Sequence, residues 1–160
     1  MNVFDFAMKM EEDGKSYYEK LASQTDQPGL QTIFSRLAED EQKHYEIFKK
    51  LKEGKSAPSV PESTTLETVR NIFEELPLPE QAVKNVAGTL EAYQHAMKVE
   101  AESTRFYEEA AAEEQDPQTK KVLLQIAAEE KQHFNIMENI YHFINAPNQY
   151  LAGSEISNAD

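Results

Sequence analysis

Cysteine is absent from the 160 residues, and glycine occurs only five times. Without cysteine the chain can form no disulfide, no thiolate nucleophile, no iron–sulfur cluster and no cysteine-based zinc site. No apolar run approaches the ~18–20 residues that a membrane-spanning helix needs. The N-terminus, MNVFDFAMKM, lacks the basic region and the apolar core of a secretory signal. We therefore expect a soluble, cytoplasmic protein with no membrane partner.

Positive charge is also in short supply, because 16 lysines and arginines face 29 acidic residues, which gives a formal net charge of −13. Such a chain repels nucleic acid and anionic membrane surfaces and attracts cations. Most of these charges serve solubility. The length favours one domain that is large enough for a hydrophobic core. We expect no nucleic-acid partner.

Apolar residues at helical spacing fill most of the chain and predict four long helices. The expected helices cover about residues 3–24, 29–53, 89–114 and 118–145. The third of them could begin as early as residue 80. The segment 54–80 reads as a connection with one short helix, about 65–76, between breaks marked by proline. We assign residues 1–146 to one helical domain and 147–160 to a polar C-terminal tail, which contains Pro147 and Gly153 and does not predict a sturdy fifth helix.

The two halves of the chain repeat with an offset of 89 residues. MKMEEDGKSYYE (8–19) aligns with MKVEAESTRFYE (97–108), and AEDEQKH (38–44) aligns with AAEEKQH (127–133). Each half is therefore one helix hairpin, and the connection is long enough to run the length of a 25-residue helix, about 40 Å. The sequence predicts an all-α four-helix bundle made of two hairpins and one long crossover.

Six ionisable residues occupy the apolar stripes of these helices. They are Glu11, Glu41, His44, Glu100, Glu130 and His133. Within each hairpin they lie about equally far from the turn, so the hairpin brings its three polar side chains to one level near the middle of the bundle. The neighbouring acids Glu12, Asp40, Glu102 and Glu129 are one helical step away, and the stripe and the repeat favour the six.

Two divalent cations would explain this buried set. An unpaired buried carboxylate is costly, and four carboxylates balance two M²⁺ ions. In each Glu-x-x-His pair the two residues share a helix face and can reach the same ion. An isolated Glu-x-x-His is usually a surface feature, but six residues that coincide through a repeat indicate a site. The mixed oxygen and nitrogen ligands suit iron or manganese, and zinc could also bind.

A glutamate on each of two helices, with Glu-x-x-His on each of the other two, resembles the rubrerythrin and ferritin-like di-iron proteins over about residues 3–145. The resemblance implies a ferritin-like bundle, two iron ions, and redox chemistry with O₂ or peroxide. It also implies that Tyr18 and Tyr107, two turns beyond Glu11 and Glu100, hydrogen-bond the ligands; otherwise they are core aromatics. His95 and His142 are off the ligand face.

The chain also departs from the family pattern. Peroxidase-type rubrerythrins carry a cysteine-ligated iron domain, which this chain lacks, so the resemblance implies a separate electron-donor protein. An additional family glutamate is replaced by Ser103, which matches Gly14 in the other half. We expect an oxidoreductase that reduces peroxide or O₂, with an iron-binding, ferroxidase or iron-storage protein as the alternative and a scaffold with structural metals as a third option. We also expect a homodimer, because the crossover exposes apolar surface and the family often dimerises.

Overall fold

A computed structural model describes residues 2–77 and 89–158 of the chain. This part is helical, and it confirms the expected all-α bundle of two hairpins with one long crossover. The expectation of a helix start near residue 80 falls in 78–88, outside the described residues, as does the end of the segment 54–80. The helices are α1 (Val3–Gln24), α2 (Pro28–Lys52), α3 (Thr65–Glu75), α4 (Thr89–Glu113) and α5 (Pro117–Asn158).

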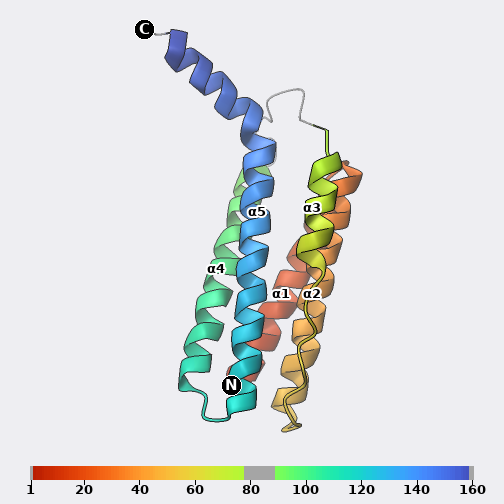
Figure 1. Cartoon of the computed structure of the whole chain (residues 1–160), viewed down its shortest axis with the longest axis vertical. Coiled ribbons are helices and arrows are strands. Elements are labelled where there is room, and N and C mark those ends of the chain that lie inside the picture. Colours follow the sequence, from red (N-terminus) through yellow and green to blue (C-terminus); the bar gives the residue numbers. More distant parts are fainter. Residues whose placement is uncertain (1, 78–88, 159–160) are drawn as a thin grey trace.

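The two hairpins stand side by side (Figure 1). Helices α1 and α2 pack along each other in one hairpin, and α4 and α5 do so in the other. After α2 the chain turns back and runs along that helix to the opposite end of the bundle, with α3 in the second half of this path. The crossover therefore covers one side of the molecule, and α1 and α4 face each other on another side.

The helix ends follow from local sequence. The Asn2 side chain accepts hydrogen bonds from the backbone N–H groups of Phe4 and Asp5, and Asp5 caps Asn2 in return. Helix α2 begins with Pro28, whose missing N–H is not needed in a first turn. It ends before Gly54, whose φ of 75° lies in the left-handed region that glycine tolerates best. These signals fix the first hairpin close to its expected bounds.

Helix α5 continues through Pro147 to Asn158, so the expectation that this helix ends near residue 145 was wrong. A proline inside a helix removes one hydrogen bond and bends the helix, but the helix can resume beyond it. Figure 1 shows α5 changing direction in its C-terminal part and projecting beyond the bundle. In the described part of the chain, no helix combines the length and apolarity needed to cross a membrane.

The apolar core is divided into two clusters with a polar layer between them. Along α2, Leu37 belongs to one cluster and Ile47 to the other, and Glu41 and His44 lie between these two residues. On α1, Tyr18 belongs to the first cluster and Ala7 to the second, and Glu11 lies between them. Apolar packing above and below therefore encloses the polar layer at mid-bundle and keeps it away from bulk water.

Candidate metal centre

The structure brings the six stripe residues together in this polar layer. Each of them exposes at most 3% of its surface. Their ligand-type atoms form two groups, and within each group these atoms lie within 4.8 Å of one another. Glu41 and Glu130 belong to both groups, so they lie between the two positions. The first group is Glu11, Glu41, His44 and Glu130, and the second is Glu41, Glu100, Glu130 and His133.

Each imidazole points its Nδ1 atom at a glutamate of the other hairpin. His44 Nδ1 lies 2.8 Å from Glu130 Oε1, and His133 Nδ1 lies 2.8 Å from Glu41 Oε1. The two contacts are related by the 89-residue repeat, because His44 aligns with His133 and Glu41 with Glu130. The centre therefore has approximate two-fold symmetry, and both of its halves are needed to complete either group.

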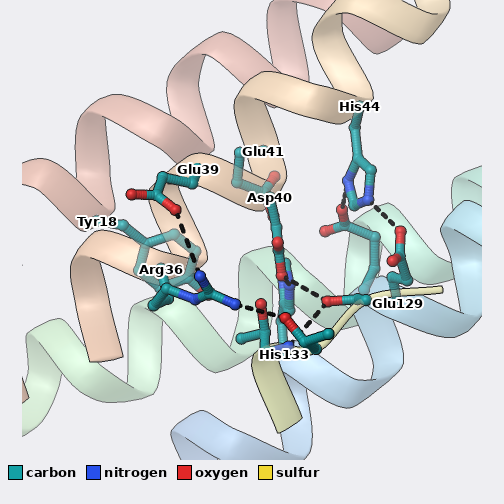
Figure 2. A network of polar contacts seen from close by, with 12 residues as sticks. Tyr18, Arg36, Glu39, Asp40, Glu41, His44, Glu129 and His133 are labelled. Atoms are coloured by element: carbon teal, nitrogen blue, oxygen red, sulfur yellow. Dashed lines mark hydrogen bonds and ion pairs between the residues drawn. The ribbon is translucent and has the colours of Figure 1, made fainter. Parts of the chain in front are cut away.

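The outer nitrogen of each imidazole meets a further carboxylate. His44 Nε2 donates to Glu129 Oε2 at 2.6 Å, and His133 Nε2 donates to Asp40 Oδ2 at 3.0 Å. In Figure 2 a dashed line joins the His44 ring to Glu129. A carboxylate in this position fixes the ring and leaves Nδ1 directed at the centre.

Sequence reasoning missed this role of Asp40 and Glu129, because helix phase placed them one step outside the ligand stripe. A signal was available, since the repeat puts an acid at both positions. What helix phase cannot show is that each acid reaches the imidazole of the opposite hairpin.

Two buried tyrosines complete the layer. Tyr18 Oη donates to Glu100 Oε1 at 2.5 Å, and Tyr107 Oη donates to Glu11 Oε1 at 2.7 Å. Burial, together with the nearby carboxylates, raises the pKa of both tyrosines well above the ordinary value of 10.0. The hydroxyls therefore keep their protons and remain donors to the glutamates. His95 and His142 are exposed and lie outside both groups.

Without cations the charges of the centre are balanced by protons. Burial and the neighbouring carboxylates raise the pKa of Glu41 and of Glu130 well above the ordinary value of 4.5. Burial alone would lower the pKa of His44 and His133, but the surrounding carboxylates outweigh it and raise the pKa of both well above 6.5. Protons on these glutamates and histidines therefore offset the negative charge of the buried carboxylates.

The residues present fit divalent cations, because several buried oxygen and nitrogen atoms that could coordinate a metal have no hydrogen-bond partner. These atoms are Glu11 Oε2, Glu41 Oε1, Glu100 Oε2 and His133 Nδ1. His133 Nδ1 and Glu41 Oε1 are close without forming a hydrogen bond, as expected of two atoms that converge on a common ion rather than on each other. Leaving such atoms unsatisfied costs about 1–3 kcal/mol each, and more when they are charged.

Gly14 lets one of the shared glutamates approach α1. A Cβ atom at this position would lie 3.0 Å from Glu41 Oε2, which is tighter than ordinary contacts. The absence of a side chain therefore allows the Glu41 carboxylate to rest against the helix. The sequence repeat pairs Gly14 with Ser103 but does not show this contact.

The family model for rubrerythrin matches residues 2–141. The chain belongs to the rubrerythrin family. Among curated proteins and among solved structures no significant match was found. Membership of the rubrerythrin family and the buried carboxylate and histidine groups together support a di-metal centre in this chain.

Proposed function

We propose that this chain is a di-iron oxidoreductase of the rubrerythrin type, which reduces peroxide or O₂ with electrons from a separate donor protein. The observation that carries the proposal is the pair of buried groups that share Glu41 and Glu130, with donor atoms left without partners. Family membership supports the same conclusion. Manganese or zinc could occupy the same oxygen and nitrogen donors, and the redox role requires iron.

The proposed ligands divide into shared and terminal ones. Glu41 and Glu130 would bind the cations at both positions, because they belong to both groups. Glu11 with His44 completes one position, and Glu100 with His133 completes the other. When bound, two iron(II) ions would supply the two electrons that convert one peroxide and two protons into two waters. The buried apolar clusters exclude bulk water and so strengthen every electrostatic contact in the layer.

The residues around these ligands hold and orient them. Asp40 and Glu129 keep the imidazole Nδ1 atoms directed inward, through hydrogen bonds at Nε2. Tyr18 and Tyr107 hold one oxygen of each terminal glutamate and leave the other oxygen free to bind a cation. Metal binding displaces the protons of the centre, so it is expected to release protons to solvent.

An iron-binding or ferroxidase function is the alternative, and a cavity beside the crossover favours it. This cavity, of about 190 Å³, lies beside the crossover and reaches His44. Its lining includes Asp40, Glu62 and Glu129, with one lysine, Lys43. An acidic opening that ends at a proposed ligand suits the passage of cations.

The deciding experiment is rapid-mixing spectroscopy of metal-free protein that is loaded anaerobically with two iron(II) per chain. Oxidation much faster with peroxide than with O₂, with full recovery after re-reduction, supports the oxidoreductase. Ready oxidation by O₂ with continued iron uptake beyond two ions per chain supports iron handling instead. A large shell of subunits in solution would also favour storage, whereas a dimer would favour the enzyme.

Two variants test the ligand assignment in the same assay. Glu41→Ala removes a shared ligand and should disturb both positions, whereas His44→Ala removes a ligand of one position only. Retention of two tightly bound ions by both variants would show that the assignment is wrong.

A further inference from the structure

A cavity of about 130 Å³ lies between α1 and α4 and reaches the metal centre, whereas helix α3 of the crossover packs on α2 and α5. Its inner lining includes Glu41, Glu100, Glu130 and Tyr18. Since one water molecule occupies about 30 Å³ in the liquid, the cavity has room for a few water molecules or for one small ligand. It is therefore suited to a small polar ligand beside the proposed cations.

Two small residues open this space. Gly14 and Ser103 both line the cavity, and each lies three residues after a terminal glutamate, on the same helix face. A larger side chain at either position would point into the space between α1 and α4. At Gly14 even a Cβ would press on Glu41 Oε2.

The cavity breaks the two-fold symmetry of the centre. Glu100 lines it, whereas Glu11, the repeat counterpart of Glu100, does not. The lining thus contains three residues of the group completed by His133. From the group completed by His44 it contains only the two glutamates that both groups share. The two metal positions have equivalent ligands but different access.

The surface at the outer end of the cavity also differs between the halves. Tyr17 and His95 line the cavity, and their ring centroids lie 5.3 Å apart. Tyr17 Oη donates to the carbonyl oxygen of Ala92 at 2.6 Å, which holds the ring in place. The repeat counterparts are Phe106 and Phe6, stacked at 5.9 Å. One side of the centre therefore has a polar aromatic pair, and the other has an apolar pair.

We propose that the cavity between α1 and α4 admits a small oxidant or inorganic anion and binds it at the metal position completed by Glu100 and His133. This inference rests on the proposed di-metal function and deepens it by assigning different roles to the two positions. A cation held by Glu100 and His133 would be open to the small ligand, because Glu100 lines the cavity. The cavity does not reach Glu11 or His44, so a cation held by these two residues would not be open to the ligand from this side.

The test uses azide as the probe and cobalt(II) as the metal, so that it depends on neither iron nor redox turnover. Val99 is half-buried and lines the cavity, and Val99→Trp should fill it. The matched control is Met97→Trp, because Met97 is half-buried on the same helix but packs against the apolar cluster. Stopped-flow absorption should show azide association slowed by about tenfold or more in Val99→Trp, and little change in the control.

A crystal structure of the azide complex of the unaltered protein provides a second, independent measurement. Azide should lie in the cavity, bound to the cation held by Glu100 and His133. Azide bound only beside His44, or an association rate unaffected by Val99→Trp, would overturn the proposal and leave the metal centre intact. Failure of the protein to bind two cobalt(II) ions would instead overturn the centre, and the cavity proposal with it.

Discussion

His44 on α2 and Glu129 on α5 lie 2.6 Å apart, from the imidazole Nε2 to the carboxylate Oε2. The contact crosses between the hairpins, and the repeat reproduces it between His133 and Asp40. The outer carboxylates therefore tie the hairpins together at the same level as the proposed ligands.

Removing an outer carboxylate should weaken metal binding without removing a ligand. We expect Glu129→Ala to lower metal affinity by about tenfold or more, because the His44 ring loses its fixed orientation. Competition with a coloured chelator measures this. Glu12→Ala is the matched control, since Glu12 is exposed and adjoins a ligand in sequence. Equal affinities of the two variants would contradict an orienting role for Glu129.

Gly14→Ala should separate protein stability from metal affinity. Alanine in a helix interior is favoured over glycine by about 1 kcal/mol, so the metal-free variant should be as stable as the parent or more stable. The new Cβ displaces Glu41 Oε2, so the variant should bind metal less tightly. Urea unfolding and chelator competition on the same samples measure both quantities. A variant that gains stability with unchanged affinity would show that Glu41 needs no contact with α1.

The two tyrosines should affect different metal positions. Tyr18→Phe removes the hydroxyl that donates to Glu100, and Tyr107→Phe removes the one that donates to Glu11. Each variant should still bind two cobalt(II) ions, because no ligand is lost. We expect Tyr18→Phe to alter azide binding more than Tyr107→Phe, since Glu100 lines the cavity between α1 and α4. Identical effects in azide titrations would mean that access to the two positions is equal.

The metal-free protein should become less stable as pH rises from about 6 to 9. The pKa values of Glu41, Glu130, His44 and His133 are all raised in the folded state. The folded protein therefore holds more protons than the unfolded chain above the ordinary values of 4.5 for the glutamates and 6.5 for the histidines. Stability falls as pH rises wherever the folded state binds the excess protons.

Urea unfolding of chelator-treated protein across this pH range measures the effect. The metal-loaded protein is the control, because bound cations would replace the protons and flatten or reverse the slope. On the acid side the sign is opposite, since the pKa values of Glu11 and Asp40 are lowered and their contribution is lost as pH falls. Metal-free stability that rises from pH 6 to 9 would contradict the charge balance described for the centre.

Much of the fold and of the site could be predicted because the two halves of the sequence repeat the same pattern. Apolar periodicity located α1 and α2 to within about one residue at each end, and the offset of 89 residues selected the six stripe residues. One glutamate on a stripe is ambiguous by a helical step. The same residue type at the same level in both hairpins removes much of that ambiguity, and the structure brings all six together.

Other features could not be predicted, because they depend on how the hairpins pack together or on whether a helix continues past a proline. The expected helix end near residue 145 was wrong, because α5 accommodates Pro147 and continues. The roles of Asp40 and Glu129 depend on how the hairpins face each other. The cavity between α1 and α4 depends on the joint effect of small residues on two helices that meet only in the folded chain.

Because both hairpins lie in one chain, equivalent residues on the two sides of the centre can be substituted independently. Each hairpin carries half of the six residues, so two identical hairpins around a true two-fold axis would present the same set. Covalent linkage gives the second half an effective concentration of about millimolar, so pairing no longer depends on how much protein is present. It also frees equivalent positions to diverge, as Tyr17 has from Phe106 and Gly14 from Ser103. Identical partners must change both sides of their centre together, whereas a duplicated chain can open one side and keep the other closed.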